Sequence, residues 1–115
     1  MLSRFDDYPI HQTPDPIAMP ASSDKDVYER YWFNGYSTTG DMYFEIGTAL
    51  YPHLGIRDCG ISIAVDGVQH AFHASCRIEG DPADQIVGPF RLDVLEAMRS
   101  CRVVLESNET DFACD

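Results

Sequence analysis

The stretch that decides the fold comprises residues 31–76 and reads YWFNGYSTTGDMYFEIGTALYPHLGIRDCGISIAVDGVQHAFHASC. It contains four runs in which apolar residues alternate with polar or small ones, a pattern typical of strands with two different faces. Turn-forming residues separate the runs, notably residues 37–41 and the Asp66-Gly67 pair. Glycine supplies the positive φ that tight hairpins need. The stretch therefore predicts a four-stranded antiparallel meander.

The period of two assigns the side chains of the second run to two faces of the sheet. One face receives Met42, Phe44, Ile46 and Leu50, and the other receives Tyr43, Glu45, Ala49 and Tyr51. With the first turn centred near Thr39, the expected cross-strand pairs are Trp32 with Ile46, Asn34 with Phe44 and Tyr36 with Met42. A ladder of aromatic and branched residues of this kind usually belongs to a core.

The third run also separates into two unlike faces. Cys59, Ile61, Ile63 and Val65 form an apolar stripe, whereas Gly60, Ser62 and Ala64 form a face of small residues. If the next hairpin centres between Asp66 and Gly67, Cys59 lies opposite Ala74 and Cys76 lies opposite Arg57. Small side chains leave room beside their face. A neighbouring helix or strand fills that room in one interpretation, and a ligand cavity occupies it in the other.

The four cysteines, Cys59, Cys76, Cys101 and Cys114, contain no C-x-x-C pair. This spacing signals neither a structural zinc site nor a thioredoxin-type redox motif, so free thiols are expected. His70 and His73 would project to opposite faces of a regular strand and could not share one ion. We therefore expect no metal and no cofactor.

Residues 91–106 are ambiguous between helix and strand. Phe90, Leu92 and Val94 alternate as in a strand, but Leu, Glu, Ala, Met and Arg are good helix formers. Two strands with a turn near residues 97–99 are the favoured interpretation, and a helix remains the alternative.

The chain is expected to divide into an extended N-terminal arm, residues 1–22, and one antiparallel β domain, residues 23–115. Pro9, Pro14, Pro16 and Pro20 disfavour helix in the arm. The net charge of −11 would repel phosphate backbones and anionic headgroups, so nucleic acid is not expected as a partner. No run approaches the ~18 apolar residues of a spanning helix. The opening residues do not resemble a secretory leader, and a cytoplasmic location is expected.

Two carboxylates are the candidates for acid or base chemistry. Glu45 lies within an otherwise apolar run, where burial would raise its pKa. The plainer interpretation places it on a solvated face near Arg30 or Arg77. Asp41 lies at a strand end, where such residues usually cap turns.

Residues 28–75 and 87–109 resemble the front part of bacterial proteins related to carotenoid 1,2-hydratase (hydroxyneurosporene synthase) and the AttH-type lipocalin-like family. The resemblance rests on the aromatic cluster Tyr31, Trp32 and Phe33, on Gly40, and on Tyr43 and Phe44. It implies an all-β fold in which the meander forms a partial lipocalin-like (calycin) barrel or sandwich. Family members are several times longer, so the resemblance also implies an incomplete β domain with an exposed edge strand.

Three functions follow as alternatives, and whether the chain is an enzyme stays open. The first is a lipocalin-like module that binds an apolar small molecule, with Trp32, Tyr43 and Phe72 as wall residues. The second is a hydratase-like enzyme acting on an isoprenoid double bond, in which Glu45 or Asp41 would protonate the alkene. The third is an interaction fragment completed by a partner chain through strand addition, including a homodimer formed through an open sheet edge.

Overall fold

The structure, a computed structural model, describes residues 6–7, 20–79 and 83–115. These residues form seven strands: β1 (Glu29–Tyr36), β2 (Met42–Tyr51), β3 (Ile56–Val65), β4 (Val68–Arg77), β5 (Ile86–Val87), β6 (Phe90–Glu96) and β7 (Ser100–Leu105). The all-β prediction is confirmed, because the described part of the chain contains no helix. It accordingly offers no helix that could cross a membrane. Most of the predicted extended arm, residues 1–22, lies outside the described residues.

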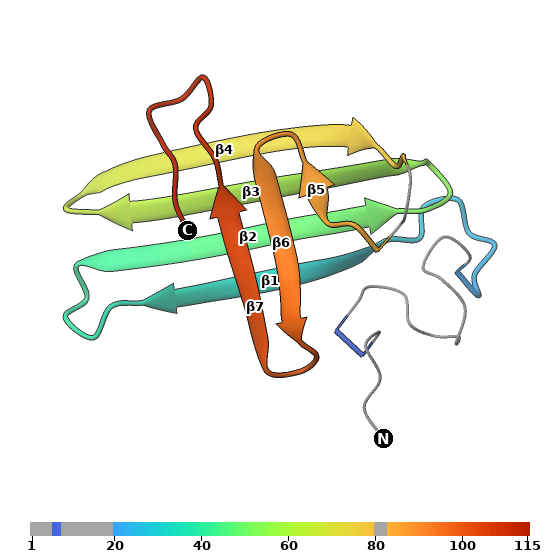
Figure 1. Ribbon diagram of the computed structural model, residues 1–115, viewed down its shortest axis with the longest axis horizontal. Coiled ribbons are helices and arrows are strands. Elements are labelled where there is room, and N and C mark those ends of the chain that lie inside the picture. Colours follow the sequence, from blue (N-terminus) through green and yellow to red (C-terminus); the bar gives the residue numbers. More distant parts are fainter. Residues whose placement is uncertain (1–5, 8–19, 80–82) are drawn as a thin grey trace.

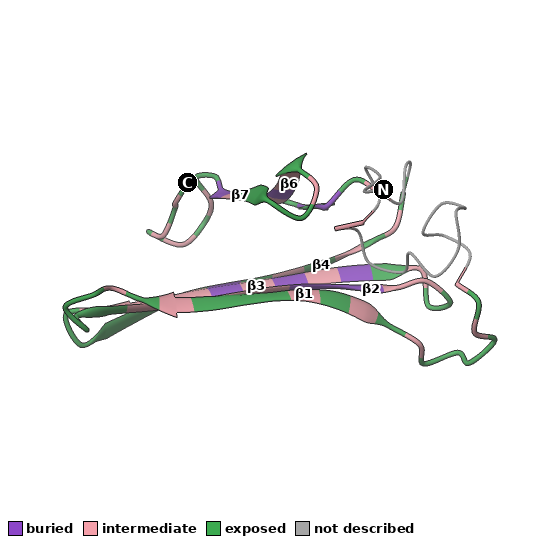
Figure 2. Ribbon diagram, turned by 90° about the horizontal axis from the view of Figure 1, so that it is seen from below, coloured by how far each residue is buried: buried purple, intermediate pink, exposed green. Residues whose placement is uncertain are grey.

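The strands form two antiparallel sheets. The large sheet has the strand order β1-β2-β3-β4, which is the predicted meander, and the small sheet has the order β5-β6-β7. In Figure 1 the strands β6 and β7 cross the large sheet steeply. Figure 2 shows that the small sheet covers one face of the large sheet, whose other face carries no second layer of strands. The described residues thus form an open two-layer sandwich rather than a closed barrel.

The core lies between the two sheets. Its buried apolar members are Cys59, Ile61 and Phe72 from the large sheet and Val87, Phe90, Leu92 and Leu105 from the small one. Phe90 is completely buried. Burial of one such side chain stabilises the fold by about 1.5 to 3 kcal/mol, so these contacts hold the small sheet on its face.

The expected register of β1 and β2 is wrong by one residue. Trp32 lies opposite Gly47, Asn34 opposite Glu45, and Tyr36 opposite Tyr43. The turn centres between Thr39 and Gly40, where Gly40 has a φ of 78° and donates its backbone N–H to the Ser37 carbonyl at 3.0 Å. A shift of one residue moves each partner to the opposite face of the sheet. Trp32 therefore shares a face with Gly47 and not with the core residue Ile46.

The predicted register of β3 and β4 is confirmed. Cys59 pairs with Ala74 and Arg57 pairs with Cys76. Asp66 and Gly67 both have positive φ values, 50° and 77°, as a two-residue hairpin turn of type I′ requires. The four cysteines are free thiols in the structure.

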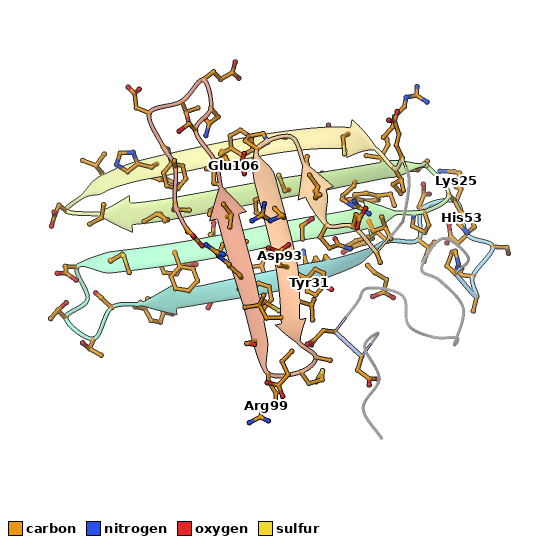
Figure 3. The ribbon with its side chains drawn as sticks, in the orientation of Figure 1. Lys25, Tyr31, His53, Asp93, Arg99 and Glu106 are labelled. Carbon is orange, nitrogen blue, oxygen red and sulfur yellow. The ribbon has the colours of Figure 1, made fainter. Side chains whose placement is uncertain are left out.

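Residues 90–105 form two strands, as the favoured interpretation predicted. Arg99 donates its backbone N–H to the Glu96 carbonyl at 3.0 Å and Met98 has a φ of 60°, which closes the hairpin. Figure 3 places Arg99 at the tip of this hairpin. Packing of Phe90 and Leu92 against the large sheet outweighs the helix propensity of the segment.

The last residues run along β7. Leu105 and Cys114 form an isolated antiparallel bridge with two backbone hydrogen bonds of 2.8 and 3.0 Å. Arg102 adds a hydrogen bond of 2.6 Å from Nε to Oδ1 of Asp115. These contacts cover part of the outer edge of the small sheet.

Candidate functional site

The candidate site lies on the open face of the large sheet. Paired residues of neighbouring strands point to the same face, so each row of the sheet can be read across all four strands. Three rows matter here: Arg30, Ala49, Asp58 and Ser75; Trp32, Gly47, Gly60 and His73; and Asn34, Glu45, Ser62 and Ala71.

The central row brings two rings over two glycines. A methyl group on Gly47 would lie 3.2 Å from Cε3 and 3.3 Å from Cζ3 of Trp32. A methyl group on Gly60 would lie 3.2 Å from both Cε1 and Nδ1 of His73. Each ring therefore leans inward from an outer strand across the bare backbone of its inner neighbour. We call Trp32 and His73 together the ring platform.

A groove of about 680 Å³ extends over the ring platform. The flanking rows, except Asn34, line it, together with Tyr28 and Tyr51, whose rings stack with centroids 5.5 Å apart. Trp32 is 52% exposed, and the Arg30 guanidinium carbon lies 5.6 Å from the centroid of its ring. The volume is in the range of small-molecule sites, about 300 to 1,000 Å³.

Two carboxylates contribute negative charge to the groove. Glu45 Oε2 accepts a hydrogen bond of 2.9 Å from the Tyr43 hydroxyl, and this bond raises the pKa of Tyr43. Burial is the main cause of the raised pKa of Tyr51, and the charge of Asp58 adds to it. The groove therefore combines an aromatic floor with hydrogen-bonding groups along its sides.

The structure brings only some of the predicted site residues together. Trp32 and Tyr43 lie on the open face, where Tyr43 reaches the groove through its bond to Glu45. Phe72 lies on the opposite face, 8% exposed, in the core beneath the small sheet. The three predicted wall residues therefore do not line one cavity.

The two candidate acids are also separated. Glu45 lines the groove, whereas Asp41 lies in the β1–β2 turn. Ser37 Oγ and Thr39 Oγ1 donate hydrogen bonds of 2.5 and 2.6 Å to Asp41 Oδ1, and they lower the pKa of that carboxyl. A general acid near neutral pH needs the opposite shift. Asp41 serves as a turn cap, as its position indicated.

His70 and His73 project to opposite faces, as expected. The ring of His70 lies 5.8 Å from that of Phe112, on the covered side, and His73 lines the groove. Within residues 6–7, 20–79 and 83–115, no group of three or more His, Cys, Asp or Glu side chains is placed to hold a metal ion.

Sequence reasoning missed Gly47 as a site residue, placed Gly60 only on the small-residue face where a ligand cavity was one of two interpretations, and missed His73 and Asp58. A signal for the first two was present, because glycine inside a strand often marks a close approach of another group to the backbone. That Gly47 and Gly60 lie opposite each other, however, follows only from the register of β2 and β3.

One protein family, described as a family of unknown function (DUF8625), matches residues 2–115. The chain belongs to DUF8625. No curated protein matches the chain, and no solved structure does. The DUF8625 match says nothing of carotenoid hydratases or AttH-type proteins, so that resemblance stays a prediction. The site of this DUF8625 chain must accordingly be interpreted from its own geometry.

Proposed function

We propose that the chain is a small-molecule-binding module that seats a ring-shaped ligand on the ring platform. The observation that supports this most is the central row, in which Trp32 and His73 lean over Gly47 and Gly60 inside an open groove. Stacking of a further ring on such a surface contributes about 0.5 to 1.5 kcal/mol beyond its buried area. A flat floor bounded by polar groups suits a ligand that has both a flat face and a polar rim.

A purely structural role would have the two rings shield the glycine backbone. That role accounts for the contacts to Gly47 and Gly60 but not for the choice of glycine. A glycine inside a strand costs roughly 0.5 to 1 kcal/mol relative to alanine. With alanine at both positions, the methyl groups themselves would cover the backbone. With glycine, the rings of Trp32 and His73 lie closer to the sheet, which makes the groove deeper.

The proposal keeps the first of the three predicted functions and moves its site. Trp32 remains a residue that contacts the ligand, His73 is added to it as the second ring of the platform, and Phe72 is assigned to the core. For the hydratase alternative only Glu45, of the two acids, lies beside the proposed ligand. Strand addition and a homodimer through a sheet edge remain predictions.

The test uses Trp32, which is the chain's single tryptophan, so its fluorescence reports on the groove directly. A library of small ring compounds is screened by ligand-observed NMR, and hits are titrated by Trp32 fluorescence. Binding detected by NMR should be lost in Trp32→Ala and in His73→Ala.

The matched control is Tyr36→Ala. Tyr36 is a 75% exposed aromatic residue on the same strand and face as Trp32, but it does not line the groove. This variant should bind as the unmodified chain does. Failure of every ring compound to bind, or binding that survives both Trp32→Ala and His73→Ala, would overturn the proposal.

A further inference from the structure

The polar groups around the ring platform identify the class of ligand, given the small-molecule function proposed above. We propose that the groove binds a neutral saccharide, seated as a short oligosaccharide along the strand direction. The inference rests on the placement of charge and of hydrogen-bonding groups at the two ends of the groove.

One end of the groove holds Arg30, Asp58 and Ser75, which share a row. The other end holds Glu45 and Ser62, and Gln69 donates from Nε2 to Ser62 Oγ at 2.8 Å. The two rows lie four residues apart along the strands, which corresponds to about 13 Å. Both ends therefore offer donors and acceptors, with the ring platform between them.

The charges disfavour an anionic ligand, which would meet Glu45 and Asp58 on a chain whose net charge is −11. A cation would be attracted by these two carboxylates, but its usual place on an aromatic residue is the exposed face of the ring. The Arg30 guanidinium already lies beside the Trp32 ring and would repel a second cation there. A neutral ligand can lie on the ring platform without meeting a like charge.

A purely apolar ligand would leave the ends of the groove unsatisfied. Covering Glu45, Asp58 and Arg30 without replacing their hydrogen bonds to water would leave three charged groups unsatisfied, which is more costly than leaving neutral groups unsatisfied. This consideration favours a hydroxyl-bearing molecule over the apolar ligand predicted from the sequence.

A saccharide meets the requirements that these residues set. Each hydroxyl both donates and accepts, so it can donate to Glu45 or Asp58 and accept from Arg30 or Gln69. The C–H face of a sugar ring is apolar and packs on a flat aromatic surface. Linked rings would extend from the platform into the polar ends.

The experiment titrates the chain with neutral gluco-, galacto- and manno-oligosaccharides of increasing length, followed by calorimetry and Trp32 fluorescence. Affinity should rise with length until the groove is filled. Glu45→Gln and Asp58→Asn should each weaken binding about tenfold, because the amide oxygen still accepts a hydrogen bond but no longer carries the charge that strengthens it. Thermal unfolding of each variant verifies that the fold is retained.

Asp66→Asn is the matched control, because it removes an exposed carboxylate in the β3–β4 turn at a φ that asparagine tolerates. It should leave the affinity unchanged. If ring compounds bind through Trp32 but no saccharide does, the inference is overturned and the proposed function stands. If nothing binds, both are overturned. Saccharide binding unaffected by both Glu45→Gln and Asp58→Asn would overturn the assignment of the polar ends.

Discussion

Trp32 and His73 come from the two outer strands of the large sheet, yet they lie in the same row and lean toward each other. This relationship exists because their inner neighbours, Gly47 and Gly60, are themselves cross-strand partners. Side chains at those two positions would keep the rings apart from the backbone. The pair of glycines thus determines the depth of the groove and the height of its floor.

Gly47→Ala and Gly60→Ala should weaken ligand binding with little effect on stability. A methyl group at either position would press on a ring at 3.2 Å, and both rings are exposed enough to move away. Loss of chain entropy in the unfolded state favours alanine by about 0.4 to 1 kcal/mol, which offsets the displacement. We expect unfolding free energies within about 1 kcal/mol of the unmodified chain and affinities lowered about tenfold. Urea titration and calorimetry measure the two effects separately.

Gly35→Ala should lower stability and leave ligand binding unchanged, the reverse of the effect expected for Gly47→Ala and Gly60→Ala. A methyl group at Gly35 would lie 2.8 Å from Cε1 of Phe44, so the half-buried ring must shift. Overpacking of this kind costs about 1 to 3 kcal/mol. The expected result is a lower urea midpoint with unchanged affinity, because Gly35 and Phe44 lie on the covered face. A loss of affinity without a loss of stability would contradict the assignment of the two faces.

Phe72→Leu tests whether Phe72 belongs to the core or to a ligand site. Phe72 is 8% exposed and packs in the cluster that includes Phe90 and Leu92. The smaller side chain should reduce the free energy of unfolding by about 1 kcal/mol or more. Ligand binding should be unchanged in the folded protein, as measured by Trp32 fluorescence well below the melting temperature. Weakened binding by the folded variant would return Phe72 to the site.

The Cys59 thiol should make stability depend on alkaline pH. Burial raises its pKa from the ordinary value of 9.0 to about 11. Between these values the unfolded chain releases the proton and the folded chain retains it, so unfolding becomes more favourable as pH rises. The free energy of unfolding should fall by about 2 kcal/mol from pH 9 to pH 11.

Cys59→Ala provides the reference for this measurement, because it removes the Cys59 thiol and leaves every other titratable group of the chain in place. Urea unfolding of both chains across the pH range gives the difference in slope. Parallel curves for the two chains would show that Cys59 makes no contribution.

Much of the local structure follows from the sequence. Alternation of residue types predicts each strand of the meander. The tight Asp66-Gly67 turn permits one register for β3 and β4, and the structure confirms that register. The β1–β2 turn is longer, and placing its centre half a residue early, at Thr39, shifted the register by one residue and set Trp32 opposite Ile46 instead of Gly47. Turn geometry decides that register, and several turns are compatible with residues 37–41.

The candidate site was predicted less completely than the strands. Trp32 and Glu45 were identified because an aromatic residue and a carboxylate stand out within their strands. His73 and Asp58 were not, since each becomes part of a site only beside residues from other strands. Phe72 was assigned to the same cavity as Trp32 although it faces the core.

By itself, the sequence determined the strands, the hairpins and the division of each strand into two faces, because these depend on local conformation and on a period of two. Only the tertiary structure decided what lies over each face. The apolar stripe of β3 marks one face for burial, but aromatic residues lie on both faces, Phe44 and Phe72 on one and Trp32 and Tyr51 on the other. The sequence therefore left the cover of the second face open between a neighbouring element and a ligand cavity. The small sheet packs on the face where Ile61 and Phe72 meet Phe90, and the ring platform is left on the open face.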